Sequence, residues 1–218
     1  MTAPPLTPQL VAALQDVSSG ATGVVRQVID GLLGLADNGQ RLPAVAAFVA
    51  DQLPWCAPMW HVVHATTAED PQLALRSLRE RLDFDVERSV ATVAKLLAER
   101  GRAVQAMPGS DLVAAVLRRL PQPTGPAGVV GLVGADAVGP TGMLNIVGTG
   151  ELAGRTPTVI ITTSVKLIPE EAFQRLGAPG FERVPLGLFD QVVIDGEVLT
   201  PVEAGQRAAA LAARHKLG

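Results

Sequence analysis

Apolar residues in the first part of the chain recur at the spacing of an α-helix. Helical periodicity at residues 10–14 and 24–33 predicts two helices, a third is predicted over 43–53, and a fourth follows a break at 54–59 and continues to about residue 65. The first helix pauses at 17–20, where Ser18 or Ser19 is positioned to cap the second one. The stripe of the second helix consists of Val24, Val25, Val28, Ile29, Leu32 and Leu33.

A much longer helical pattern follows over residues 69–101. Apolar residues keep their helical spacing on an otherwise charged cylinder, and Gly101 is a typical helix end. The segment is predicted to form one nearly continuous helix, or two helices that meet around 83–85.

In the second half, short apolar runs alternate with helical segments. Strands are predicted over 101–106, 129–133, 158–162 and 189–194, and helices over 111–120, 151–154, 169–176 and 200–215, with Ser110 capping the first of these. This alternation indicates a parallel sheet with right-handed crossovers. The predicted fold class is therefore α/β, with a helical region (1–67) and a helical connector (68–101) packed on a Rossmann-like, mainly parallel sheet domain (102–218).

Composition excludes several classes of protein. A net charge of −3 and a pI near 5.6 argue against a nucleic-acid-binding surface, which would be basic. No apolar run reaches the ~18 residues of a membrane span, and the first ten residues lack the features of a signal peptide. One cysteine provides no internal disulfide. We therefore expect a cytoplasmic protein that binds neither nucleic acid nor membrane.

The candidate chemistry lies in residues 129–149. Gly134 and Asp136 follow a buried strand, at the edge where open α/β sheets bind ligands. A carboxylate partly buried there can have a raised pKa and transfer protons near neutral pH, or it can simply cap the next turn. Asn145, Gly148 and Thr149 can bind a phosphate or sugar hydroxyl at a helix start. Alternatively, they form a turn that needs glycine for its backbone geometry.

These residues resemble the GAD…NG…N-K-x-G-T motif of the initiation factor 2B alpha/beta/delta subunit family. That family includes methylthioribose-1-phosphate and ribose-1,5-bisphosphate isomerases. The matching segments are 134–136, 141–142 and 145–149, together with 16–21, 55–59, 181–185 and 188–190. The resemblance covers residues 10–67 and 86–213. It implies a sugar-phosphate site with no cofactor and no metal, a catalytic acid/base role for Asp136 in aldose–ketose conversion, and a homodimer formed through the C-terminal α/β face.

The same comparison of motifs implies further ligand-binding residues. Ser19 and Gly20 lie where the isomerases have an R-G-A segment, with Ser19 in place of the arginine. Cys56 lies in a segment that borders the family's sugar-phosphate pocket. Lys166 and Arg155 are candidate replacements for missing phosphate-binding cations, or else solvated surface charges.

The chain also differs from the family's catalytic pattern. The family's cysteine motif matches residues 87–93 best, which places Arg88 or Ser89 at the position of the cysteine. Ile146 replaces the lysine that follows the motif's asparagine. Two hypotheses follow: an isomerase of a small phosphorylated sugar, or a noncatalytic subunit that senses a sugar phosphate or nucleotide.

Cys56, His61 and His64 raise the question of a metal site. Their C-x4-H-x2-H spacing matches no structural zinc pattern, and a fourth ligand would be required. A buried thiol beside two amphipathic histidines is the preferred interpretation.

Overall fold

The structure is a computed structural model that describes residues 4–16, 19–35, 41–121 and 128–214. The four predicted N-terminal helices are confirmed and pack on one another around a shared apolar core. Their bounds are α1 Pro8–Gln15, α2 Ala21–Leu33, α3 Leu42–Gln52 and α4 Pro58–Thr66.

The N-terminus of α2 differs from the prediction. Ser18 lies outside the described residues, and Ser19 does not cap the helix. The N-cap residue is Gly20, which has no side chain for capping. The Ala21 amide instead donates a hydrogen bond to the carboxylate of Asp136, which is 115 residues away in the chain. A tertiary contact thus replaces the local cap.

Helix α5 (Pro71–Arg100) is one uninterrupted helix, so the alternative of two helices meeting at 83–85 is wrong. Its buried positions keep helical spacing through this region, because the polar Asp85 and Ser89 continue the stripe. The Ser89 hydroxyl donates to the Thr162 carbonyl and accepts from the Gly196 amide, both at 3.0 Å. These two bonds attach α5 to the sheet. Gly101 ends the helix in the left-handed region, as predicted.

The predicted parallel sheet is confirmed, with one addition. Its strand order is β1-β2-β5-β7-β8, in which the first four strands are parallel and β8 is antiparallel to β7. The strands are β1 Ala103–Ala106, β2 Val129–Gly134, β5 Thr158–Thr162, β7 Gln191–Ile194 and β8 Glu197–Leu199.

A second sheet was not predicted. The strands β3 (Ala137–Val138), β4 (Gly142–Ile146) and β6 (Phe181–Pro185) form an antiparallel sheet in the order β3-β4-β6. The alternation of strands and helices therefore does not continue throughout this half. The turn predicted at 139–142 is the loop of the β3–β4 hairpin, whose short strands have too few residues for a clear pattern.

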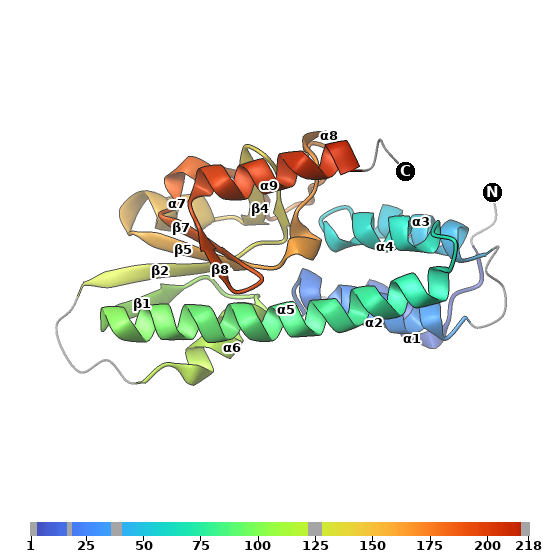
Figure 1. Ribbon diagram of the computed structural model, residues 1–218, viewed down its shortest axis with the longest axis horizontal. Coiled ribbons are helices and arrows are strands. Elements are labelled where there is room, and N and C mark those ends of the chain that lie inside the picture. Colours follow the sequence, from blue (N-terminus) through green and yellow to red (C-terminus); the bar gives the residue numbers. More distant parts are fainter. Residues whose placement is uncertain (1–3, 17–18, 36–40, 122–127, 215–218) are drawn as a thin grey trace.

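Helices cover both faces of the five-stranded sheet (Figure 1). Helices α5 and α6 (Asp111–Arg119) pack on one face. Helices α7 (Thr149–Arg155) and α9 (Pro201–Arg214) lie on the other. The short elements η1 (Ser164–Lys166), α8 (Glu170–Phe173) and η2 (Leu186–Leu188) complete the described chain. The fold is thus α/β with a helical N-terminal region, and α5 extends along both parts.

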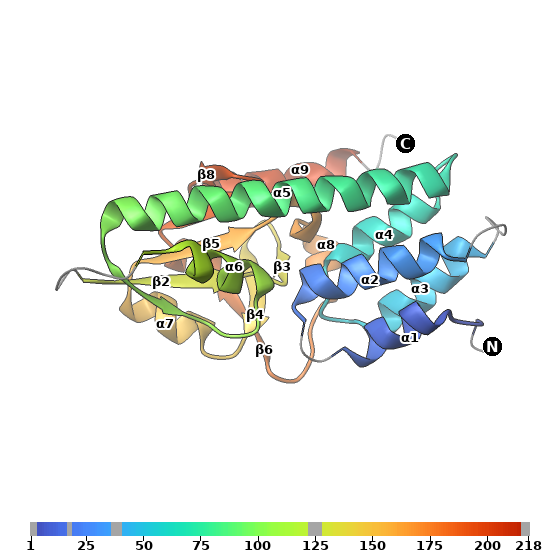
Figure 2. The same ribbon diagram turned by 90° about the horizontal axis from the view of Figure 1, so that it is seen from below.

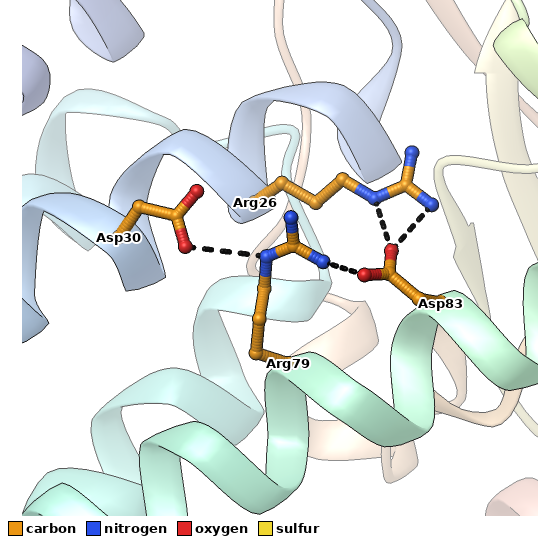
Figure 3. Close-up of polar contacts among 4 residues, drawn as sticks. All are labelled: Arg26, Asp30, Arg79 and Asp83. Carbon is orange, nitrogen blue, oxygen red and sulfur yellow. Dashed lines mark hydrogen bonds and ion pairs between the residues drawn. The ribbon is translucent and has the colours of Figure 1, made fainter.

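A surface network of charges joins α2 to α5 (Figure 3). Arg79 of α5 binds Asp83 of the same helix and also contacts Asp30 of α2 at 3.3 Å. Arg26 of α2 in turn binds Asp83 at 2.8 Å. The four side chains therefore form a continuous chain of ion pairs across the two helices.

Candidate functional site

Asp136 lies directly beyond the carboxyl end of β2. Gly134, the last residue of that strand, is buried against the start of α6. A Cβ atom at Gly134 would lie 2.4 Å from the hydroxyl of Ser110, so only glycine permits this approach. Ser110 caps α6 as predicted, by accepting a hydrogen bond from the Val113 amide. This close packing places the N-terminal turn of α6 beside the end of β2.

The N-terminus of α2 approaches the same position from the helical region (Figure 2). The Ala21 amide donates to Asp136 Oδ1 at 3.4 Å. The positive end of the α2 dipole therefore faces a carboxylate, an arrangement that favours negative charge. The site is thus built from both parts of the chain.

Lys166, in the η1 segment that follows the carboxyl end of β5, lies at the same site as Asp136. Its side chain is only 3% exposed, so the alternative of a solvated surface charge is wrong for this residue. No hydrogen bond or ion pair of its ammonium group is formed with any residue that the structure describes. A buried cation without a partner is energetically unfavourable in a protein interior unless a ligand or water compensates it.

These groups line one small cavity. Gly20, Gly134, Asp136, Asn145 and Lys166, all predicted, surround it together with the unpredicted Thr22, Ser110 and Asp111. The space open to the centre of a water molecule is about 20 Å³, enough for one water. The Thr22 hydroxyl is fully buried and forms no hydrogen bond within the described part of the chain.

Burial shifts the ionisation of both charged groups towards their neutral forms. Desolvation raises the pKa of Asp136, and the positive charge of Lys166 and the Ala21 amide oppose this only in part. Desolvation likewise lowers the pKa of Lys166 against the opposing effects of Asp136, Cys56 and Asp111. A carboxyl group and an amine with shifts in these directions can exchange protons with a bound molecule closer to neutral pH.

Cys56 is buried beside this site but lines a different cavity, between α4 and α8. Its thiol donates a hydrogen bond to the Ala21 carbonyl at 3.9 Å. Desolvation, with a smaller effect of Asp136, raises the pKa of the thiol to about 12. Because the thiolate is the nucleophilic form, a thiol whose pKa is raised in this way is poorly suited to act as a nucleophile near neutral pH.

Asn145 and Thr149 bind each other. The Asn145 amide donates to the Thr149 hydroxyl at 3.0 Å, and that hydroxyl donates to the Ile146 carbonyl at 2.8 Å. Gly148 has φ +99°, which favours glycine over other residues. Gly148 and Thr149 therefore stabilise the turn before α7, whereas Asn145 also lines the cavity.

The remaining candidates lie elsewhere. The Ser19 amide donates to Asp16, and Ser19 is not among the cavity-lining residues that the structure describes. Arg155 is a surface residue paired with Glu151. His61 Nε2 lies 2.8 Å from the Leu167 carbonyl, and His64 Nδ1 lies 2.6 Å from the Trp60 carbonyl.

Two general features of the described chain complete this description. Within its described ranges no helix is long and apolar enough to cross a membrane. Those ranges also contain no cluster of three or more His, Cys, Asp or Glu residues that could hold a metal ion.

Sequence reasoning missed Thr22, Ser110 and Asp111 as members of the cavity. Ser110 and Asp111 were recognisable as a helix start after a strand, a common place for ligand contacts. Thr22 had no such signal, because nothing in its neighbourhood indicates that the second helix approaches the sheet.

These features define an α/β protein with a polar cavity between a helical region and the carboxyl edge of a parallel sheet. Solved structures with the same fold include the Pyrococcus horikoshii translation initiation factor eIF-2B. It is 12% identical, with a TM-score of 0.71 over 89% of this chain and 96% of that one.

Two further structures share the fold. The first is the tetrameric eIF2B-beta2-delta2 complex from C. thermophilum, with 14% identity and a TM-score of 0.65 over 95% and 93% of the two chains. The other is the 5-methylthioribose 1-phosphate isomerase from P. horikoshii, with 13% identity and a TM-score of 0.58 over 93% and 87%. No family model and no curated protein matches the sequence. The resemblance found in the motifs is thus supported at the level of the fold.

Proposed function

We propose that this protein binds a small phosphorylated sugar at the cavity between α2, α6 and η1. The main support is Lys166, a buried residue whose ammonium group forms no hydrogen bond or ion pair with the described residues and borders the cavity beside Asp136, which attracts it electrostatically. An anionic ligand would compensate this charge, and the N-terminus of α2 favours the same sign. The Thr22 hydroxyl supplies a further unused donor.

In this proposal Asp136 acts as the acid/base group of an aldose–ketose isomerisation. In a sugar 1-phosphate the reaction breaks the bond between C1 and the ring oxygen, and the ring oxygen gains a proton. C2 loses its C–H proton and C1 gains one, while the C2 hydroxyl loses its proton and becomes the ketone. A carboxyl group with a raised pKa is suited to carry such a proton. One of the proteins with this fold is a 5-methylthioribose 1-phosphate isomerase, which favours this class of substrate.

A sugar phosphate is larger than the present cavity. Binding therefore requires α2 and the turn before α6 to move apart, since these two segments enclose the space from opposite sides. The hydrogen bond between the Ala21 amide and Asp136 is one contact that joins α2 to the sheet beside this cavity.

A second function is favoured by Cys56. The chain has a single cysteine, and burial raises the pKa of its thiol to about 12, which is unfavourable for a cysteine nucleophile. This favours a noncatalytic protein that senses a sugar phosphate or nucleotide, or an assembly subunit. The solved initiation factor subunits with this fold are consistent with that alternative.

Thermal-shift measurements test binding. The ligands are 5-methylthioribose 1-phosphate and ribose 1,5-bisphosphate, with ribose and inorganic phosphate as controls. A ligand that binds only the native protein raises the Tm by mass action. We expect the sugar phosphates to stabilise wild type, the Thr22→Val and Lys166→Met variants to respond less, and Arg155→Ala, a surface control, to respond fully.

Proton exchange then separates the two functions. A stabilising sugar phosphate is incubated in D₂O, and NMR follows deuterium at C1 of the ketose product and at C2 of the remaining substrate. Exchange in wild type that disappears in Asp136→Asn supports the isomerase. Binding without exchange supports the noncatalytic alternative. Absence of any Tm change with all phosphorylated ligands overturns the proposed site.

We also propose that the chain forms a homodimer through its C-terminal α/β part. Val202 is 68% exposed, and Leu188 and Val198 are exposed on neighbouring elements that contact α9. Light scattering at micromolar concentration should give twice the mass of the chain, whereas a monomer would refute the dimer.

A further inference from the structure

A third cavity, larger than the one beside Asp136, is lined by neighbours of Lys166 in the chain. Its volume is about 560 Å³, within the range of about 300–1,000 Å³ that is typical of small-molecule sites. Residues of α4, α5, η1 and α9 line it, together with Ile194 at the carboxyl end of β7. In Figure 1, α5 and α9 lie on opposite sides of the sheet, and this cavity joins them beyond the ends of the parallel strands.

The charged groups of this cavity are all basic. Arg81 of α5 and Arg207 of α9 line it from opposite sides, and His61 lies near them. The described lining residues include no carboxylate. Two guanidinium groups in one concave site, in a chain with a net charge of −3, indicate a local preference for an anion.

Both guanidinium groups have donors available. Arg81 makes no ion pair or hydrogen bond with any residue in the described ranges, and its charged neighbour on α5 is Asp85, which attracts it electrostatically. Arg207 binds Glu197 of β8 at 2.6 Å. A guanidinium group has five N–H donors in a fixed fork, so a single carboxylate partner leaves Arg207 able to bind a second anion.

The rest of the wall is apolar. Leu78 of α5, Leu167 after η1 and Leu211 of α9 line the cavity, and the first two are almost fully buried. An inorganic ion would leave the apolar wall uncovered, whereas an apolar body would cover it and gain hydrophobic free energy, mainly at the partly exposed Leu211.

We propose that this cavity binds a small organic anion with an apolar body. Arg81 and Arg207 hold the anionic head group, and the side chains of Leu78, Leu167 and Leu211 contact the apolar body. The site is distinct from the proposed sugar-phosphate site, because Ser164, Val165 and Leu167 line this cavity whereas Lys166 lines the other one.

Isothermal titration with octyl phosphate tests the proposal. The probe combines a phosphate head with an eight-carbon chain, and is used below its micelle concentration. Inorganic phosphate has the head group alone, and 1-octanol has only the chain. We expect octyl phosphate to bind wild type at least tenfold more tightly than either comparator. Equal affinity for octanol and octyl phosphate would overturn the anion site.

Variants locate the binding. Arg81→Gln combined with Arg207→Gln should weaken the affinity for octyl phosphate at least tenfold. Arg155→Gln, which changes a surface arginine on α7, should leave that affinity unchanged. Ala210→Trp keeps both charges but places a large ring at the cavity wall, and it should also abolish binding. Circular dichroism and urea unfolding establish that each variant is folded.

The two proposed sites are distinguished by Asp136→Asn. This variant should bind octyl phosphate with the affinity of wild type. That result is expected even if the sugar-phosphate proposal fails and neither protein binds a sugar phosphate. Loss of octyl phosphate binding in Asp136→Asn would assign the probe to the smaller cavity and overturn the proposal. Wild-type affinity in both the double arginine variant and Ala210→Trp would overturn it as well.

Discussion

The Ala21 amide and the Asp136 carboxylate are joined by a hydrogen bond of 3.4 Å between two parts of the chain that are far apart in sequence. The N-cap residue of α2 is Gly20, which has no side chain to accept a capping hydrogen bond. The carboxylate of Asp136 accepts such a bond in its place. The same carboxylate borders the cavity that contains Lys166. The residue proposed to transfer protons is therefore also a link between the helical region and the sheet.

The first prediction concerns Cys56. Its thiol is 1% exposed and its pKa is about 12, so native protein near pH 8 contains almost no thiolate. A thiol reagent such as Ellman's reagent should not react with the folded protein on the timescale of minutes. In concentrated urea, one equivalent should react at the rate of a model thiol.

Absorbance of the released thionitrobenzoate provides the measurement. Because the sequence has one cysteine, the amplitude of the reaction in urea serves as an internal control for the native sample. Rapid reaction of the folded protein would show that the thiol is accessible, and would return Cys56 to consideration as a nucleophile.

The second prediction tests the approach of β2 to α6. Gly134→Ala places a methyl group 2.4 Å from the Ser110 hydroxyl and 2.8 Å from its Cβ, so the variant should lose about 1–3 kcal/mol of unfolding free energy. Urea unfolding measures this loss.

A double-mutant cycle shows whether the steric cause is correct. Ser110→Gly removes both clashing atoms while it weakens the cap of α6, since Ser110 accepts from the Val113 amide. The double variant should therefore be more stable than the sum of the two single losses predicts. Strict additivity would mean that Gly134 is required for some other reason.

Local sequence patterns predicted most of the fold. The strand at 158–162, the cap at Ser110 and the helix end at Gly101 follow from residue types within a few positions of each element. The β3-β4-β6 sheet was missed for two reasons. Its strands pair over long distances in the sequence, since Gly142 pairs with Pro185, 43 positions further on. In addition, β3 has only two residues, too few for a recognisable pattern.

The site was predictable only in part for a similar reason. Asp136 and Gly134 follow a clear strand, so their place at the carboxyl edge could be read from the sequence. The burial of Lys166 could not, because the segment around it gives no sign that α2 covers it. Thr22 joins the cavity only through the tertiary approach of α2 to the sheet.

The third prediction concerns Asp85, a carboxylate in the buried stripe of α5. It is 6% exposed and forms no hydrogen bond with the described residues. Desolvation, together with the negative charge of Asp195, raises its pKa above the usual range of an aspartate, and Arg81 and Arg88 oppose this only in part. Folding therefore favours the protonated form. The stability that this group contributes is present below its unfolded pKa and is lost as the pH rises through its native pKa.

Asp85→Asn removes this pH dependence. The variant should exceed wild type by about 1 kcal/mol in unfolding free energy at neutral pH, where wild type holds a buried carboxylate that Arg81 and Arg88 compensate only in part. The difference should shrink as the pH falls towards 4. Urea unfolding across this range measures it, with Glu99→Gln on the exposed face of α5 as the matched control. A constant difference at all pH values would exclude ionisation as the cause.

The last prediction concerns the charge network between α2 and α5 (Figure 3). Arg79 connects Asp30 and Asp83, but all three side chains are between 26% and 54% exposed. Water screens such pairs, so Arg79→Ala should lose no more than about 1 kcal/mol of unfolding free energy. Most of that loss should disappear in about 1 M salt, where the Debye length falls to about 3 Å.

A cycle of Arg79→Ala and Asp30→Ala, measured by urea unfolding at low and high salt, isolates the contact between the two helices. Arg175→Ala is the control. It breaks an exposed ion pair with Glu171, four residues earlier in the chain, and this pair does not connect two helices. A coupling energy well above 1 kcal/mol that persists in high salt would mean that packing of the Arg79 side chain, rather than its charge, holds α2 on α5.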